Sequence, residues 1–306
     1  MKDLAASVLA RLKKQSKETR LSYQICLQLF CQEEFLRRLS LSRYNSNFIL
    51  KGGLFIFCLT EFQSRTTQDI DFLMCRQSND NDNVQQLMSE ICMVHTVNDF
   101  VTIEVLDAKT ISQDNEYHGV SVRFLGHIKQ VRVPFSADVG VGDIIVPEPV
   151  KRKLKTRLPG FEEPQVYTYS LESTVAEKFD AILNRMEATS RMKDFFDIFY
   201  LSNMYDFQGQ KLSEALKQTL QHRGTPYDRD CFVRIANFRN NRILVSQWIR
   251  YQSIMQGHLP EFSDVLDRIQ SFLEPIFEAA IQNRDFLLYW KSAQTQWQME
   301  NSSYGN

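Results

Sequence analysis

The sequence predicts a mixed sheet domain of the α/β or α+β class, preceded by helices and followed by a mainly helical region. Apolar residues recur at helical spacing in the first forty-odd positions, and short strand-like runs fill residues 48–141. Helical periodicity returns after a proline-rich stretch. We therefore expect N-terminal helices over 1–45 that pack on a sheet domain over 46–158, and a helical domain over 159–306.

The composition is that of an ordinary globular protein. The 306 residues are 43% hydrophobic and 24% charged, and the net charge is −1. A net charge this small produces no overall electrostatic field that would attract nucleic acid or membrane. Any site for a polyanion must therefore be a local patch of charge. The six cysteines form no C-x-x-C pair and the five histidines lack metal-ligand spacing. This favours reduced core thiols and argues against a zinc site.

The sequence carries no signal for export or membrane insertion. Its first residues lack a continuous apolar segment. No run reaches the roughly 18 apolar residues that cross a bilayer. We expect a cytoplasmic protein with no membrane partner.

Two helices are expected before the sheet domain. Leu4, Val8 and Leu12 recur at helical spacing, and a second apolar run extends from Ile25 to Leu39. The polar run 45–47 ends this region.

The sheet domain begins with a short apolar run, 48–50, that stops at Lys51-Gly52-Gly53. A mostly apolar helix is expected over 54–62, a strand over 69–74 and a helix over 84–93. Further strands are expected in three ranges, with Gly119 and Gly126 marking turns: 101–106, 120–124 and 129–141.

Four prolines mark the change to the helical domain: Pro147, Pro149, Pro159 and Pro164. Helices are expected over 171–187 and 193–205, and the rest continues with helical periodicity. Residues 286–290 are expected to be helical as well.

The pair Gly52-Gly53 lies between an apolar strand and a helix. Glycines let backbone amides approach an anion closely, and the helix start then carries positive partial charge toward it. A plain tight turn remains the alternative.

Asp69 and Asp71 are two residues apart on a predicted strand, so both face the same side, while Ile70 and Phe72 face the core. Two neighbouring carboxylates repel each other unless a cation or solvent intervenes, and Mg²⁺ prefers oxygen ligands. An exposed sheet edge with solvated acids is the alternative. A third carboxylate would complete a two-metal site; Asp138, near the end of a strand-like run, is the first candidate and Asp143 the second.

These motifs, in this order, resemble the nucleotidyltransferase fold of the polymerase-β type. More narrowly, ILKGGLFIFCLTEFQSRTTQDIDFL resembles the AbiEii/AbiGii toxin family of bacterial abortive-infection systems. Two later blocks, ADVGVGDIIVPEP and TYSLESTVAEKFDAILNRMEATSRMKDFFDIFYL, resemble the third-carboxylate strand and the helical signature of that family. The resemblance covers about 45–250 and implies an α+β fold, in which a nucleotidyltransferase-type mixed sheet with flanking helices precedes a mainly helical domain.

The resemblance implies roles for the matched positions. Gly52 and Gly53 hold nucleotide phosphates, Lys178 is a phosphate-binding charge and Asp194 is the late acidic motif. The expected metal ligands, for two Mg²⁺ ions, are Asp69, Asp71 and Asp138. The expected catalytic residues are these three with Lys178 and Asp194. The expected nucleotide-binding residues are Lys51, Gly52, Gly53, Leu54, Arg65 and Lys178.

Each late position has a structural alternative. Lys178 could be a solvated helix lysine. Asp194 could cap the helix that follows it or pair with Arg191, and Asp197 is the substitute acid. Arg65 precedes the acidic strand and could equally lie idle on the surface.

One residue departs from the family pattern. Many members carry Ser or Thr after the two glycines, where this chain has Leu54. A leucine cannot donate a hydroxyl hydrogen bond to phosphate, although the backbone amides remain available.

The resemblance implies transfer of a nucleoside monophosphate from a nucleoside triphosphate to an acceptor hydroxyl, with release of pyrophosphate. The acceptor would be the 3′ end of a tRNA or a protein side chain. It also implies a toxin with a cognate antitoxin encoded nearby. The alternatives are a nucleotide-binding regulatory module without catalysis and an antibiotic-modifying nucleotidyltransferase. The basic run 151–157 could contact an RNA backbone or form a solvated linker face.

Overall fold

A computed structural model describes residues 3–19, 21–111, 119–255 and 259–300. The chain divides into two compact units. Unit 1 comprises Met1–Asp143 and Pro149–Tyr169, and unit 2 comprises Ile144–Glu148 and Ser170–Asn306. The division expected at 158/159 stays a prediction; in the structure, strands of the unit 1 sheet continue to Thr168.

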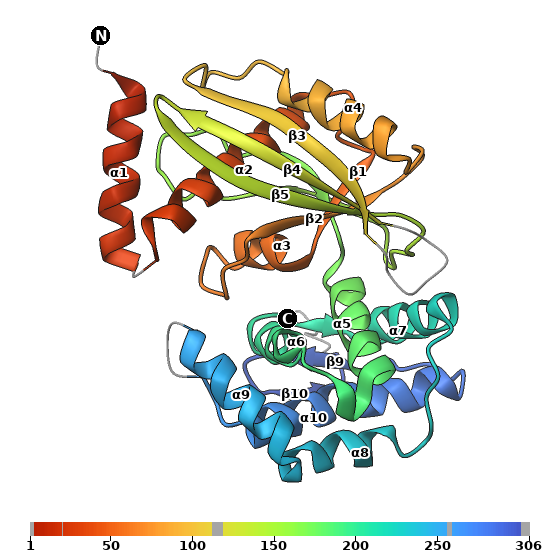
Figure 1. Cartoon of the computed structure of the whole chain (residues 1–306). Coiled ribbons are helices and arrows are strands. Elements are labelled where there is room, and N and C mark those ends of the chain that lie inside the picture. Colours follow the sequence, from red (N-terminus) through yellow and green to blue (C-terminus); the bar gives the residue numbers. More distant parts are fainter. Residues whose placement is uncertain (1–2, 20, 112–118, 256–258, 301–306) are drawn as a thin grey trace, which may run out of the picture. The chain divides into compact units, whose positions relative to one another are not determined.

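Unit 1 is built on a seven-stranded mixed sheet with the order β3-β4-β5-β2-β1-β7-β6. The long strands β3, β4 and β5 run side by side (Figure 1). Strand β2 pairs in parallel with β5 and antiparallel with β1, and β1 pairs in parallel with β7. The strands are β1 (Phe48–Lys51), β2 (Asp69–Met74), β3 (Val101–Ile111), β4 (Gly119–Ile128), β5 (Val131–Gly140), β6 (Val150–Lys153) and β7 (Gln165–Thr168).

One face of this sheet is apolar and covered by helix. Alternate residues of each strand point to the same side, and Phe72 of β2 and Phe124 of β4 belong to the covered face. Phe35 of helix α2 lies 6.2 Å from Phe72 and 5.1 Å from Phe124 between ring centroids. The helices of unit 1 are α1 (Leu4–Thr19), α2 (Tyr23–Leu41), α3 (Gly52–Leu59) and α4 (Asn81–Cys92).

Helix α2 carries charged side chains inside the core. Ser22 caps the helix by accepting a hydrogen bond from the Ile25 N–H. Further along, Arg37 lies 2.9 Å from Glu34 and 3.4 Å from Glu33, and all three side chains are buried. Burial raises the pKa of the Glu33 carboxyl to about 7, although the Arg37 guanidinium opposes this shift.

Unit 2 is mainly helical, as expected. Its helices are α5 (Leu171–Arg185), α6 (Met192–Met204), α7 (Gly209–Arg223), α8 (Cys231–Asn237), α9 (Arg242–Ile254) and α10 (Phe262–Ile281). A small antiparallel sheet joins them, with the order β10-β9-β8 from Phe207–Gln208 (β8), Tyr289–Lys291 (β9) and Gln296–Gln298 (β10). The predicted α+β class, with a mixed sheet unit and a mainly helical unit, is confirmed.

The helix expected over 286–290 is wrong. Residues 289–291 form β9, which pairs with β8 and β10. The Trp290 indole N–H donates to the Ser202 carbonyl, and its ring is buried. Strand pairing and this hydrogen bond, both made with distant residues, outweigh the local apolar pattern.

Two expectations from the sequence concern the state of the cysteines and the membrane. All six cysteines are free thiols, five of them buried. In the part of the chain that the structure describes, no helix is both long and apolar enough to span a membrane.

Candidate active site

The turn between β1 and α3 requires glycine at its first position. Gly52 has φ +69°, in the left-handed region that disfavours other residues. A β-carbon on Gly52 would lie 2.0 Å from Asp71 Oδ2, so the carboxylate of Asp71 rests against this backbone. Because the first N–H groups of a helix lack partners within the helix, α3 offers donors and positive partial charge at this point.

The acidic residues of β2 and β5 lie in register on the sheet face opposite the one that α2 covers. Asp71 pairs with Asp138 across two parallel strands, whose axes lie about 4.8 Å apart. On the other side, Asp71 pairs with Lys51 of β1, and Asp138 pairs with Ser121 of β4. Four neighbouring strands therefore place one row of polar side chains, Lys51, Asp71, Asp138 and Ser121, on one face.

Serine hydroxyls orient two of the carboxylates. Ser121 Oγ donates to Asp138 Oδ1 at 2.7 Å. Ser136, opposite Asp69 in the β2–β5 register, donates to Asp69 Oδ1. Asp69 is exposed, whereas Asp71 and Asp138 are half-buried. The predicted trio of acids thus shares one face, with Asp69 two residues before the in-register pair.

The donor set fits a divalent ion that shares its ligands with substrate. Within the described ranges, no group of three or more His, Cys, Asp or Glu side chains is placed to hold a metal ion by itself. Mg²⁺ is commonly held by one or two carboxylates together with substrate phosphates and water. Asp71 and Asp138, side by side, provide such an open set of oxygen donors.

Lys51 is tied to the second-choice acid. Its Nζ lies 2.8 Å from Asp143 Oδ2 and 3.4 Å from the Tyr169 hydroxyl, and it stands over the Tyr169 ring. Both charged side chains are mostly buried. Asp143 therefore neutralises Lys51 beside the row of acids, while Asp138 occupies the strand position in that row.

Leu54 and Arg65 flank the glycine turn in different ways. The Leu54 side chain is 1% exposed and belongs to the core, so only its backbone could contact a nucleotide. Arg65 lies next to the turn, because a β-carbon on Gly53 would stand 3.2 Å from Arg65 Nη1 and 2.9 Å from Thr67 Oγ1. Gly53 is thus enclosed by these two side chains.

Unit 2 gathers the late charged residues into one buried cluster. Lys178 of α5 lies 2.6 Å from Asp197 Oδ2 and 3.3 Å from Asp194 Oδ1, both on α6. Arg191 also pairs with Asp194. Lys178 is 10% exposed and Asp197 fully buried, so the alternative of a solvated helix lysine is wrong. The pairing of Asp194 with Arg191, left open by the sequence, is present together with the Lys178 contact.

Asp197, Ser121 and Ser136 were not among the predicted site residues. Asp197 was considered only as a substitute for Asp194, yet both acids contact Lys178. Their three-residue spacing on a helix places them on one face and was the available signal. Ser121 and Ser136 could not be found from local sequence, since the pairing of β4 and β2 with β5 brings them to the acids.

A glycine turn at the start of a helix thus lies beside parallel strands with carboxylates in register, so donors for an anion and oxygen ligands for a cation adjoin on a mixed sheet. The chain belongs to the AbiEii family: the family model described as nucleotidyl transferase AbiEii toxin, type IV TA system, matches residues 34–283. The predicted family is confirmed, and the protein is a nucleotidyltransferase of a toxin–antitoxin family.

Two solved structures have a similar chain trace over most of the chain. JHP933 from Helicobacter pylori is 14% identical with a TM-score of 0.48, and the match covers 86% of this chain and 95% of that one. The nucleotidyltransferase toxin MenT4 from Mycobacterium tuberculosis is 16% identical with a TM-score of 0.48, and the match covers 87% and 78%. The comparison with curated proteins found no match.

Membership of this family carries two general implications. A nucleotidyltransferase takes a nucleoside triphosphate, in general together with a divalent metal, and a type IV toxin has an antitoxin as its counterpart.

Proposed function

We propose that this protein is a magnesium-dependent toxin that acts in the cytoplasm. It transfers a nucleoside monophosphate from a nucleoside triphosphate to the 3′-terminal hydroxyl of a tRNA and releases pyrophosphate, as part of a phage-defence system. The observation that carries this proposal is the contact between Gly52 and Asp71, whose neighbour on the parallel strand is Asp138. The backbone N–H groups that would bind phosphate and the carboxylates that would hold metal therefore lie next to each other.

The triphosphate is bound at the start of α3. Backbone N–H groups of Gly52, Gly53 and Leu54 and the positive end of the helix receive phosphate oxygens. The Arg65 guanidinium, beside Gly53, adds a positive charge. Lys51, whose charge is offset by Asp143, holds the turn in place.

The carboxylates of Asp71, Asp138 and Asp69 hold the divalent ions, and the Ser121 and Ser136 hydroxyls fix the orientation of two of them. When bound there, two Mg²⁺ ions offset phosphate charge and activate the acceptor hydroxyl. The chain itself positions the reacting groups in line, and the residues form no covalent bond with substrate.

In unit 2, Lys178 is proposed as the charge that contacts phosphate, in line with the family motif. Asp194 and Asp197 hold its ammonium in one geometry. Because they act through Lys178, both are positioning residues.

The test is transfer of α-labelled nucleotide from each triphosphate to total tRNA, with Mg²⁺ and with a chelator. We expect labelled tRNA from the wild type in Mg²⁺, none with the chelator and none from Asp69→Ala/Asp71→Ala. The matched control, Asp82→Asn, changes an exposed acid in the first turn of α4 and should transfer normally. Undiminished transfer by the double variant would refute the metal assignment.

The same assay separates possible acceptors. Label in protein instead of tRNA would indicate an acceptor side chain, and label in an aminoglycoside would indicate an antibiotic-modifying enzyme. Either result would keep the nucleotidyltransferase site and replace the tRNA assignment.

A further inference from the structure

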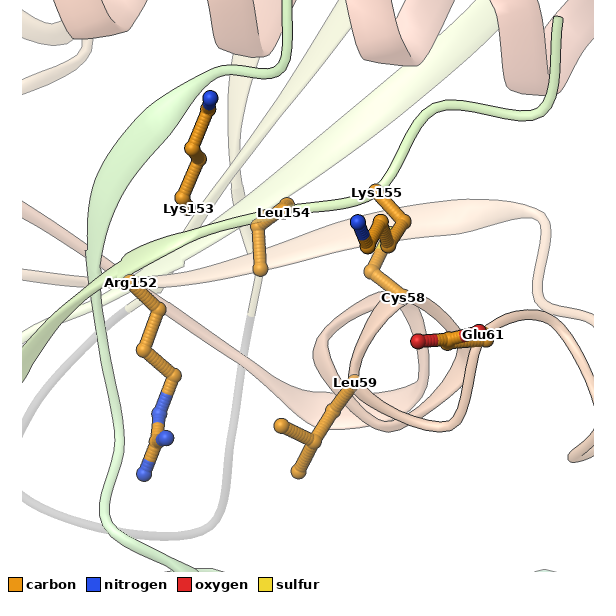
Figure 2. A pocket seen from close by; sticks show the side chains of 7 residues that line it. All are labelled: Cys58, Leu59, Glu61, Arg152, Lys153, Leu154 and Lys155. Carbon is orange, nitrogen blue, oxygen red and sulfur yellow. The ribbon is translucent and has the colours of Figure 1, made fainter. Parts of the chain in front are cut away.

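Unit 1 has a basic pocket at the sheet edge formed by β6. The pocket has a volume of about 300 Å³. Its lining includes Cys58 and Leu59 at the end of α3 and Arg152, Lys153 and Lys155 from β6 and the residues that follow it (Figure 2). None of these five residues belongs to the nucleotidyltransferase site described above. The pocket therefore requires an explanation of its own.

An arginine of this pocket has an unsatisfied donor. Arg152 is half-buried, and its Nε is buried without a hydrogen-bond partner among the described residues. A buried donor left unpaired costs on the order of 1–3 kcal/mol. A guanidinium is well suited to phosphate, and a shift of this side chain toward a bound anionic oxygen would give Nε a partner.

The charge around the pocket is positive on balance. Three cations line it, against one lining acid, Glu61. Glu163 lies 3.3 Å from Lys155 and 3.6 Å from Lys153, but these lysine side chains stay 57% and 65% exposed. Ion pairs this exposed contribute little to stability, so the two lysines can exchange Glu163 for another anion at little cost.

Two of the lysines lie on the edge strand β6, which ends at Lys153, and Lys155 follows two residues later. Lys151 and Lys153 occupy alternate strand positions, about 7 Å apart, which is similar to the repeat of phosphates along an extended single strand. Figure 2 shows Arg152 and Lys153 extending to opposite sides of the strand. Lys151 stands over the ring of Tyr167 on β7, 5.7 Å from its centroid, which adds an aromatic surface to the basic edge.

Helix α3 connects this edge to the glycine turn. Gly52 begins the helix and Leu59, in the pocket, ends it after 8 residues, so the two ends are about 11 Å apart. A strand whose 3′ end lies near Gly52 would have phosphates a short distance upstream within reach of the pocket.

We propose that the pocket formed by Arg152, Lys153 and Lys155 binds backbone phosphates of an RNA acceptor, upstream of its reacting 3′ end. This inference rests on the proposed function, because it assigns a second contact to the same substrate. Binding depends on charge and not on base sequence, so it acts mainly on affinity for RNA.

The test compares wild type, Arg152→Gln/Lys155→Gln and a control, Lys217→Gln, in which a lysine of a pocket in unit 2 is changed. The probe is a fluorescent RNA hairpin with a single-stranded 3′ end, titrated at several salt concentrations. We expect the double variant to bind about tenfold more weakly and to lose about 1.4 from the slope of log affinity against log salt, while the control is unchanged. Thermal unfolding checks that all three are folded.

Two further arms separate this inference from the proposed function. Asp71→Asn should bind the hairpin like wild type while losing transfer, and the double variant should keep transfer at saturating RNA. Equal hairpin binding by the double variant and wild type overturns the pocket assignment, as does stronger binding of polyglutamate than of RNA. Competition by inorganic phosphate alone at equal phosphate concentration would make the pocket a site for free phosphate and would also overturn it.

Discussion

The carboxylate of Asp71 fills the space above Gly52: a β-carbon at position 52 would lie 2.0 Å from Asp71 Oδ2. The glycine turn and the acidic strand are therefore mutually dependent. A change in one displaces the other, although 18 residues of chain separate them.

Gly52→Ala should abolish most activity and destabilise unit 1. The left-handed φ costs a residue with a β-carbon about 1–2 kcal/mol, and the clash moves Asp71. A displacement of about 1 Å at a reacting centre can cost about a hundredfold in rate. Nucleotide transfer and urea unfolding measure the two effects.

The control for this substitution is Gly160→Ala. Gly160 also has a positive φ, +88°, but a β-carbon there would meet no atom of the described residues within 4 Å beyond its chain neighbours. Its variant should lose a similar free energy of unfolding from the backbone alone and keep full transfer. Loss of activity in both variants would show that strain, not Asp71, is responsible.

Ser121→Ala should weaken metal use without unfolding the protein. The substitution removes the hydrogen bond to Asp138, and groups that orient metal ligands contribute about tenfold or more to affinity or activity. We expect the Mg²⁺ concentration for half-maximal transfer to rise about tenfold. Ser89→Ala removes the hydrogen bond from the Ser89 hydroxyl to the Gln85 carbonyl in α4 and should leave that concentration unchanged. An equal rise in both variants would contradict a role for Ser121 in orienting a metal ligand.

Asp197→Asn should destabilise unit 2. The change leaves the mostly buried Lys178 ammonium with Asp194 as its remaining carboxylate in this cluster. Removal of one partner from a buried ion pair costs about 3–5 kcal/mol when the other charge is left uncompensated, and the remaining Asp194 contact should keep the loss below that range. Urea unfolding measures the loss, and Asp197→Asn/Lys178→Met should recover part of it because the buried ammonium with only one carboxylate left in this cluster is gone. If the double variant lost as much free energy of unfolding as Asp197→Asn and Lys178→Met lose together, the two residues would not be coupled.

Glu33 should make stability decrease as pH rises. Burial raises the pKa of its carboxyl from 4.5 to about 7 in the folded protein. The folded state then holds the proton more tightly, so the contribution is complete below pH 4.5 and is lost as pH rises through 7. Relative to Glu33→Gln, the wild type should be most stable near pH 4.5 and lose that advantage by pH 8. Urea unfolding at pH 5, 6, 7 and 8 measures the difference, and a constant difference would contradict it.

Local patterns in the sequence determined several features by themselves. The spacing of Asp69 and Asp71 on a strand placed both carboxylates on one face, because strand periodicity is a property of the backbone. Glycine at position 52 predicted a tight turn, because glycine lacks a β-carbon and tolerates backbone conformations that other residues avoid. The order of these motifs with Asp138, Lys178 and Asp194 was enough to identify the family.

The tertiary structure decided which side chains meet. Strand order placed Asp138 beside Asp71 and Ser121 beside Asp138, and no local pattern encodes the neighbour of a strand. Helix packing buried Lys178 against Asp194 and Asp197, where the sequence allowed a solvated lysine. Trp290 lies in a strand against expectation, since its partners in β8 and β10 are set by long-range pairing. Backbone periodicity is local, whereas pairing, burial and the resulting electrostatics depend on residues far apart in the chain.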